Sequence, residues 1–298
     1  MLVPAEDREA VLKQLAGDPV RGFCLRNFMK SPREPGLTPE LLVDDVQSPR
    51  VLIARAGAEL MVYGALEHYN PAMKDLLEGR VETNGAWPDE PMRKMWQEWT
   101  EGRRFFFLNS TPYSVWRAAR LAGFDAHPED LDGPVAYLWY IQGEPRFGHL
   151  IKHPCRLGEG NELLERLKEG IPYDPEGHYT SQCLKHGPSF VCEVDGQPAC
   201  WSCTHLNGTM GMIYTPEQHR RQGYAKSLAA FQIDHMLKRD GIACCHIIDF
   251  NTASMMLVKT FGAQRWEEPL VWRLVFWPGE APPPEPPEEK KEEEGTGD

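Results

Sequence analysis

The sequence has no long apolar run and no excess of basic charge, and each absence excludes a class of protein. Its longest uninterrupted apolar segment, Val135–Ile141, has seven residues, far below the roughly 18 that a membrane-spanning helix needs. Acids outnumber bases by 44 to 32, giving a net charge of −12. We therefore expect no membrane span and no general affinity for nucleic acid or anionic lipid.

The start of the chain carries acids where a secretion signal would carry bases, and no apolar segment follows. We therefore expect a protein that stays inside the cell, in the cytoplasm or alternatively in mitochondria. Its eight cysteines are then expected to be reduced thiols, several of them buried.

Metal-ligand spacing is almost absent as well. Cys200 and Cys203 form a CxxC pair, but a zinc site would need a second pair or nearby histidines at ligand spacing. Residues three apart on a strand point to opposite faces. We expect no metal here and interpret both residues as core thiols, with a metal site as the alternative. The adjacent Cys244 and Cys245 are interpreted in the same way.

Composition divides the 298 residues into three segments. Residues 1–143 and 144–278 each contain enough apolar residues for a core, and two domains suit a chain of this length. Residues 279–298 contain eight acids, two lysines and several prolines. Such a segment cannot bury enough apolar surface to order itself, so we expect a disordered acidic tail.

Both large segments show the same order of predicted elements. In the first, a helix over Glu6–Leu15 precedes a hairpin (Val51–Ala54, Glu59–Leu66), a helix over Pro91–Thr100, a strand over Phe105–Leu108, a helix over Pro112–Leu121 and a closing strand over Val135–Ile141. In the second, the corresponding segments are Asn161–Glu169, the hairpin Phe190–Val194 and Ala199–His205, the strand Thr209–Tyr214, the long helix Tyr224–Arg239, the strand Ala243–Ile248, the helix Ser254–Phe261 and the closing strand Val271–Phe276.

The two segments can be aligned at one strand–Asn–helix–Gly pattern. Asn109 and Gly123 in the first correspond to Asn251 and Gly262 in the second. We interpret this as a tandem of two related α/β units. The alternative is chance, because many α/β domains contain such a pattern.

The most informative segment runs from Tyr214 to Leu228. A predicted strand ends at Tyr214, a basic glycine-containing loop follows, and a long helix begins. Loop N–H groups and a helix N-terminus together favour an anion. Gly223 allows close approach of the backbone, and Arg220, Arg221 and Lys226 add positive charge. This loop is neither a GxxxxGK[ST] loop nor a GxGxxG fingerprint.

The stretch Arg220-Arg-Gln-Gly-Tyr-Ala225 resembles the pyrophosphate-binding loop R/Q-x-x-G-x-G/A of the GNAT superfamily. Together with CWSCTHLNGTMGMIYTPEQHRRQGYAKSL and DFNTASM, it resembles the glycine N-acyltransferase-like branch over about residues 190–278. The loop is one residue longer than usual between Pro216 and Arg220.

This resemblance implies an α/β fold made of tandem GNAT-like units, each with a mixed, mostly antiparallel sheet flanked by helices. The N-terminal unit is degenerate, since no basic glycine loop is found over residues 71–104. The resemblance also implies acyl-CoA as co-substrate rather than a permanent cofactor. It places the CoA contacts at Met212, Ile213, Tyr214, Arg220, Arg221, Gln222, Gly223, Tyr224, Ala225 and Asn251.

Two positions depart from the family. The glutamate proposed as general base in glycine N-acyltransferases is replaced by Thr209, and the tyrosine acid of many GNAT enzymes by Val258. An amine must lose a proton to attack, and histidine is suited to accept it at neutral pH. The base stays open between a water relay and His205, Glu217, His219 or His246, each of which can also be a structural residue.

The resemblance implies an enzyme that transfers an acyl group to the amine of glycine or another small amine, by direct attack without an acyl-enzyme. A backbone N–H near Ile213 is expected to hold the oxyanion. Two alternatives stay open: a GNAT acetyltransferase acting on a protein or polyamine, and a non-enzymatic acyl-CoA-binding protein.

Overall fold

A computed structural model gives the fold of the chain. It describes residues 2–14, 19–30, 39–49, 51–56, 59–64, 103, 105–121, 123–126, 133–169, 174, 176–276 and 279. The helices are α1 (Arg8–Lys13), α2 (Pro19–Lys30), α5 (Tyr113–Leu121), α6 (Leu164–Glu169), α7 (His178–His186), α8 (Tyr224–Asp240) and α9 (Thr252–Lys259), with short 3-10 turns η4 (Gly148–Leu150) and η5 (Glu217–His219). The strands are β1 (Glu40–Val43), β2 (Val51–Ala56), β3 (Glu59–Gly64), β4 (Phe105–Pro112), β5 (Asp125–Ala126), β6 (Ala136–Gln142), β7 (Cys155–Leu157), β8 (Ser189–Val194), β9 (Gln197–Thr204), β10 (Met210–Tyr214), β11 (Ile242–Ile248), β12 (Gln264–Arg265) and β13 (Leu270–Phe276).

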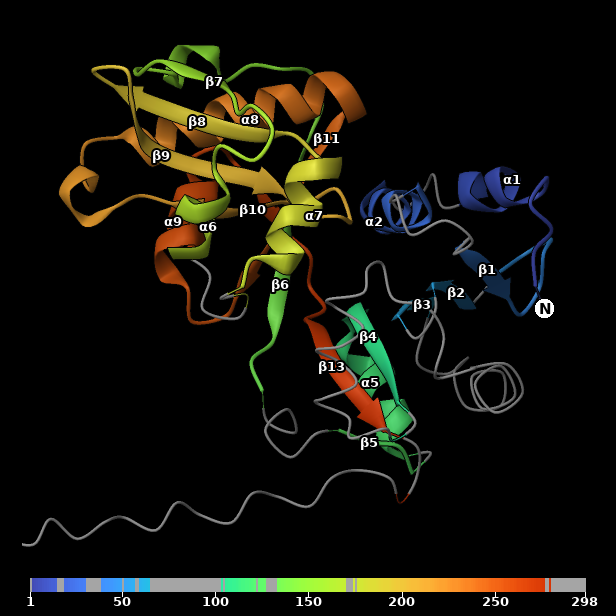
Figure 1. Ribbon diagram of the computed structural model, residues 1–298. Coiled ribbons are helices and arrows are strands. Elements are labelled where there is room, and N and C mark those ends of the chain that lie inside the picture. Colours follow the sequence, from blue (N-terminus) through green and yellow to red (C-terminus); the bar gives the residue numbers. More distant parts are fainter. Residues whose placement is uncertain are drawn as a thin grey trace, which may run out of the picture.

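The described strands form one continuous sheet rather than two separate ones (Figure 1). Its order is β1-β2-β3-β4-β13-β6-β11-β10-β9-β8-β7, with β5 and β12 as short side branches on β13 and β6. The N-terminal half supplies one end of the sheet and the C-terminal half supplies the other. The two halves therefore share a backbone hydrogen-bond network through the middle of the molecule.

The two halves exchange their closing strands. β6, from the first segment, pairs along its whole length with β11, from Ile242↔Gln142 to Ile248↔Ala136. β13, from the second segment, pairs with β4, from Leu270↔Pro112 to Phe276↔Phe105. The expectation that each strand closes its own half is therefore wrong. Periodicity identifies a strand but contains no information about which edge it joins.

Apart from this exchange, the halves have the same topology, which confirms the tandem arrangement. In each, two antiparallel pairings lead to a parallel one: β1–β2, β2–β3 and β3–β4 correspond to β8–β9, β9–β10 and β10–β11. A helix follows the last strand, α5 in one half and α9 in the other. Gly123 and Gly262, which follow those helices, both have positive φ, 91° and 72°.

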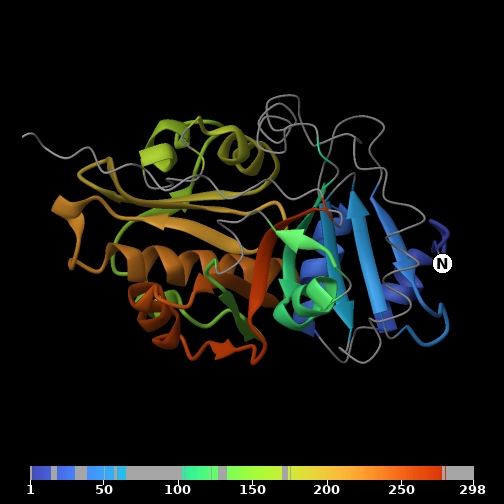
Figure 2. The same cartoon turned by 90° about the horizontal axis from the view of Figure 1, so that it is seen from below.

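Helices cover both faces of the sheet (Figure 2). The alternation of strand residues assigns each side chain to one face. In the C-terminal half, α8 and α9 lie on one face and α6 and α7 on the other. In β2, Leu52 and Ala54 join the core beneath α2, whereas Val51 and Ile53 join the core beneath α5. α2 packs on β2, β3 and β11, so one helix of the first half bridges to the second.

Most predicted elements lie within a few residues of their expected places. α8 covers the predicted long helix and buries the predicted Leu228, Ala229, Ile233, Met236 and Leu237. α6 starts at Leu164, three residues later than predicted, because a turn precedes it. β4 extends to Pro112, so Asn109 lies inside a strand, whereas Asn251 caps a helix. α2, β1, β7 and α7 were not predicted.

Some predictions cannot be compared with the structure. The helix over 91–100, the degenerate loop region over 71–104 and the acidic tail over 279–298 lie outside the described residues, apart from Arg103 and Gly279. The proposed division at residue 143 also stays a prediction. No helix in the described part of the chain is both long enough and apolar enough to span a membrane.

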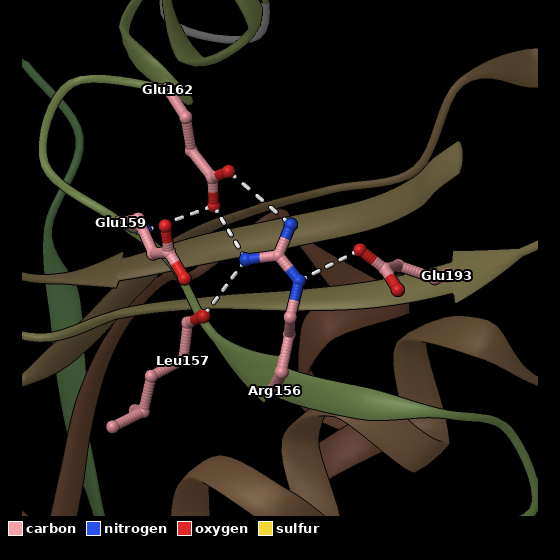
Figure 3. Close-up of polar contacts among 5 residues, drawn as sticks. All are labelled: Arg156, Leu157, Glu159, Glu162 and Glu193. Carbon is pink, nitrogen blue, oxygen red and sulfur yellow. Dashed lines mark hydrogen bonds and ion pairs between the residues drawn. The ribbon is translucent and has the colours of Figure 1, made fainter. Parts of the chain in front are cut away.

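Arg156 links the edge strand β7 to its neighbours through ion pairs (Figure 3). Its guanidinium contacts Glu193 of β8 (Nε–Oε1, 2.7 Å) and both carboxylate oxygens of Glu162 (2.8 and 3.2 Å). Glu162 also accepts the Glu159 N–H at 3.0 Å. The hydrogen-bonded Arg156 guanidinium, and to a smaller extent the Glu159 N–H, hold the pKa of the Glu162 carboxyl below its usual value. One arginine therefore joins β7, β8 and the turn that leads into α6.

Candidate functional site

β10 carries a bulge where it leaves its neighbours. Gly211 pairs with Cys203, but Tyr214 pairs with Trp201, so β10 has one residue more than β9 over this stretch. Met212 supplies the local left-handed conformation with φ 53°. On the other side, β10 pairs with β11 only at Met210↔Cys245. The two parallel strands therefore separate after Met210, and Met212–Tyr214 lie along the opening fork.

The loop predicted to bind an anion follows the fork directly. It runs through Thr215, the turn η5 and Arg220–Gly223 into α8. Gly223 is the N-cap of α8 with φ 89° and provides no capping side chain. The first intrahelical bond in this turn is Ser227 N–H to the Gly223 carbonyl. The preceding N–H groups at the helix start are thus open to a ligand, as anion binding requires.

Contacts within the loop fix its shape. Arg220 Nε donates to the Thr215 carbonyl at 3.0 Å, and Gln222 Nε2 donates to the Gln218 carbonyl at 2.9 Å. His153 Nε2 lies 3.0 Å from the Gln222 carbonyl, and its ring contacts the Tyr224 ring at a tilt of 51°, with 4.3 Å between centroids. Sequence reasoning missed His153, because nothing in the local pattern links residue 153 to a loop seventy residues away.

The charge around this helix start is positive. Arg220, Arg221 and Lys226 are exposed, and Arg221 has φ 62°. The side chain of Tyr224 is buried, so only its backbone can face a ligand. The far end of α8 is closed by Gly241 with φ 70°, whose N–H donates to the Leu237 carbonyl. The loop 215–223 therefore leads into a helix whose two ends are both well defined.

Asn251 lies where β11 passes into α9. Its side chain accepts the Ser254 N–H at 3.1 Å and so caps the helix. The residue is exposed. Val258, at the position where many GNAT enzymes have a tyrosine, is buried in the core of α9 and has no polar group.

Thr209 and His246 are brought together at the base of the fork. His246 follows Cys245, the last residue of β11 that pairs with β10. Its Nδ1 lies 3.4 Å from the Thr209 hydroxyl, and its ring meets Trp272 edge-on with 4.9 Å between centroids. Its Nε2 is buried and has no hydrogen-bond partner among the described residues. Burial lowers the pKa of His246 to about 3, with a smaller contribution from His205.

A buried polar chain connects Thr209 to the N-terminal half. Thr209 Oγ1 donates to Asn207 Oδ1 at 2.7 Å, and Asn207 Nδ2 lies 3.3 Å from Ser110 Oγ on β4. Ser110, Asn207 and Thr209 are all buried. Sequence reasoning named Thr209 and His246 as candidates but not Asn207 and Ser110, because the fold brings residues 97 positions apart in the chain into contact.

His205 lies beside this chain. Its backbone N–H donates to the Thr209 carbonyl, and its Nδ1 lies 3.0 Å from the Tyr179 hydroxyl of α7. A Cβ on Gly211 would stand 2.0 Å from His205 Nε2, so the ring lies directly over Gly211, one residue before the bulge. Sequence reasoning also missed Tyr179.

Glu217 and His219 lie apart from this cluster in η5, where His219 contacts the Tyr224 ring and Glu217 is exposed.

All eight cysteines are free thiols, and seven are buried. Cys200 packs with Tyr224 and Leu228 on the α8 face, whereas Cys203 packs on the α7 face. The two therefore point to opposite faces, as the strand alternation predicts. Burial raises the pKa values of Cys200 and Cys245 to about 12, which keeps these thiols protonated at neutral pH.

Comparison with known proteins identifies the fold. Residues 192–271, about a quarter of the chain, match the family model described as FR47-like protein. No curated protein sequence matches the chain significantly.

Solved structures resemble this chain over nearly its whole length, and two of them serve as examples. A Drosophila protein has a TM-score of 0.60 at 13% identity and covers 93% of this chain and 98% of its own. A tandem GNAT protein from the clavulanic acid biosynthesis pathway has a TM-score of 0.51 at 12% identity, with 95% and 99% covered. The chain therefore has a GNAT-like fold in a tandem arrangement. At these identities the similarity establishes the fold alone.

Proposed function

We propose that the chain is an acyl-CoA-dependent N-acyltransferase, which transfers an acyl group to glycine or another small amine. The observation that carries this proposal is the loop 215–223 with the open N-terminus of α8, placed at the end of a bulged strand that separates from its parallel neighbour. Open N–H groups and three exposed bases suit the pyrophosphate of CoA.

The fork between β10 and β11 suits the rest of the co-substrate. Residues 212–214 have no pairing partner on β11 among the described strands, because β10 pairs with β11 only at Met210↔Cys245. The pantetheine arm can pair with this backbone, in line with the contacts that the resemblance implies. Its thioester would then lie near Ile213, whose N–H can stabilise the oxyanion of a tetrahedral intermediate.

In the proposed reaction, the amine nitrogen attacks the thioester carbonyl carbon directly. The C–N bond forms, the C–S bond breaks, and the products are an amide and CoA. No covalent acyl-enzyme is needed, and the thiols of Cys200 and Cys245 are poor nucleophiles while they stay protonated.

Isothermal titration with CoA, acetyl-CoA and palmitoyl-CoA tests the binding part of this proposal. We expect saturable binding of all CoA compounds, with the preferred acyl chain indicating the donor. Binding of none of them would contradict the proposal.

Release of the CoA thiol in the presence of glycine, polyamines or a peptide amine tests the chemical part. Turnover with glycine or another small amine supports the proposed function, whereas turnover only with polyamine or peptide favours the acetyltransferase alternative.

One observation favours a non-enzymatic acyl-CoA-binding protein: Val258 is apolar and buried, so it cannot supply the acid of many GNAT enzymes. Binding without any thiol release would support that reading.

A further inference from the structure

We propose that His246 accepts the proton of the attacking amine on its Nε2, and that Thr209, Asn207 and Ser110 are positioning residues that fix its tautomer. This inference rests on the proposed acyl transfer and assigns the base that the sequence leaves open. The positioning residues come from both halves of the molecule, so the site is complete only when the halves are joined.

The orientation of the Asn207 amide follows from its neighbours. The Thr209 backbone N–H donates to Asn207 Oδ1 at 3.2 Å, which requires an oxygen at that position. The amide nitrogen therefore points the other way, toward Ser110 Oγ at 3.3 Å. Ser110 in turn donates to Asn109 Oδ1 at 2.8 Å. Each donor in this chain thus faces an acceptor.

The proton of the Thr209 hydroxyl is fixed in the same way. Thr209 Oγ1 lies 2.7 Å from Asn207 Oδ1, a carbonyl oxygen that has no proton to give. The hydroxyl therefore donates to Asn207, and it has only one proton. Toward His246 Nδ1, 3.4 Å away, Thr209 can only accept. In a neutral imidazole the proton consequently resides on Nδ1, and Nε2 carries the free lone pair.

The environment of Nε2 indicates a functional role. A buried polar atom without a partner costs free energy, and Nε2 has none among the described residues. The ring stands at the base of the fork, one residue beyond the last pairing of β11 with β10. His246 as a whole is partly exposed, whereas its Nε2 is buried, so an amine has to enter the fork to reach this atom. A primary amine at the fork would give Nε2 the donor that it lacks.

Ser110, which the N-terminal half contributes to this site, lies in a distorted stretch of β4. β4 has one residue more than β13 between Leu108 and Thr111, because Val271 pairs with Thr111 and Arg273 with Leu108. Ser110 lies in this bulge with φ 47°, a strained conformation for a non-glycine residue. The bulge turns Ser110 toward Asn207, and bulges commonly re-aim side chains next to active sites.

In the proposed step, His246 carries the proton of the amine to the leaving sulfur. The neutral amine attacks the thioester carbon, and its nitrogen becomes positively charged as the C–N bond forms. One N–H proton passes to His246 Nε2, and the electron pair of the N–H bond stays on nitrogen. The tetrahedral intermediate then expels the CoA sulfur, which receives the proton from the imidazolium. His246 returns to its neutral state with Nδ1 still bonded to Thr209.

The surroundings of His246 keep it neutral before reaction. Trp272 from β13 and Thr209 before β10 are uncharged, and His205 is the titratable group whose charge acts on it. Burial disfavours the imidazolium in the free protein. An oxyanion developing at the fork offsets that penalty, since an opposite charge nearby favours the protonated form.

The tautomer can be measured without any substrate, by long-range ¹H–¹⁵N NMR on protein labelled at histidine. We expect His246 to show a protonated Nδ1 and a bare Nε2, with no titration between pH 5 and 8. Thr209→Val should remove the preference for that tautomer, whereas Thr209→Ser, which keeps the hydroxyl, should retain it. A protonated Nε2 in the wild type would overturn the proposal, even if CoA binds normally.

Turnover distinguishes a catalytic from a structural His246. His246→Asn keeps a donor toward Thr209 but removes Nε2, and His205→Asn makes the same change at the neighbouring histidine. With acetyl-CoA and glycine, we expect a loss in kcat of about a hundredfold or more for the first variant and less than about tenfold for the second. CoA titration and thermal melting confirm that both variants fold. A kcat within about tenfold of wild type in His246→Asn would overturn the proposal; if glycine is not acylated, the NMR result decides alone.

Discussion

The protonation of His246 gives a residue-scale prediction about stability. The pKa of His246 in the folded protein is about 3, below the ordinary 6.5. Between these two pH values, His246 binds a proton in the unfolded chain but not in the folded protein. Stability is therefore lost as pH falls below about 6.5. Between pH 7 and pH 5 this contributes about 1–2 kcal/mol.

Urea unfolding of wild type and His246→Asn at both pH values measures this contribution. The variant should lose less stability on acidification by that amount. Equal losses in the two proteins would show that His246 is protonated in the folded state as readily as in the unfolded chain.

At this scale, sequence reasoning named candidate residues but not the contacts that join them. Arg220, Gly223 and Asn251 could be named because the GNAT loop is a local pattern. His246 was named as a candidate because histidine can accept a proton at neutral pH. Thr209 was named because it stands where glycine N-acyltransferases have a glutamate. Ser110, Asn207 and His153 could not be found, because their partners are brought to them by the fold rather than by spacing in the sequence.

At the scale of elements, the Arg156 contacts should stabilise β7 and the turn before α6. Arg156 and Glu162 are partly exposed, with side-chain exposures of 38% and 31%, so the effect is modest. We expect Arg156→Met to lower the free energy of unfolding by about 1–2 kcal/mol at pH 7. Arg156→Lys should recover only part of this, since an ammonium cannot form the two-pronged contact with Glu162.

The pH dependence of that effect has a definite sign. The folded pKa of Glu162 lies below its ordinary value of 4.5, so the ion pair stabilises the protein above that pH. The stabilisation disappears as pH falls through the lower folded pKa. Unfolding curves at pH 7 and pH 3.5 measure this; a difference between Arg156→Met and wild type that does not shrink at low pH would contradict it.

The elements that sequence reasoning found and missed differ in their local signals. α8 was predicted almost to the residue, because an amphipathic period, a basic last turn and Gly241 all agree. α2 was missed because Gly22 and Asn27 interrupt its pattern, and β7 because it has only three residues. The length of β4 was underestimated because Asn109, Ser110 and Pro112 resemble a loop.

For the whole molecule, the exchanged strands make the two halves dependent on each other. Residues 1–143 alone lack β13, which pairs with β4, and residues 144–298 alone lack β6, which pairs with β11. We expect neither fragment to fold alone, because each would expose unpaired strand edges. Co-expression should yield a stable complex. Circular dichroism and size-exclusion chromatography test this, and a well-folded fragment 144–298 that binds CoA would contradict it.

In the proposed function, the N-terminus of α8 holds the pyrophosphate of an acyl-CoA. Gly223→Asp places a carboxylate in that position, and Gly223→Asn places an uncharged group of the same size there; both residues tolerate the positive φ of 89°. Gly241→Asp makes the charged substitution at the other end of the helix, where φ is 70° and a Cβ meets nothing within 4 Å.

The most direct measurement is isothermal titration of wild type and these three variants with CoA. We predict that Gly223→Asp weakens binding at least about tenfold more than Gly223→Asn, because the added charge opposes the phosphates. Gly241→Asp should bind like wild type. Equal affinities in wild type and Gly223→Asp, or a wild type that binds no CoA, would contradict the account.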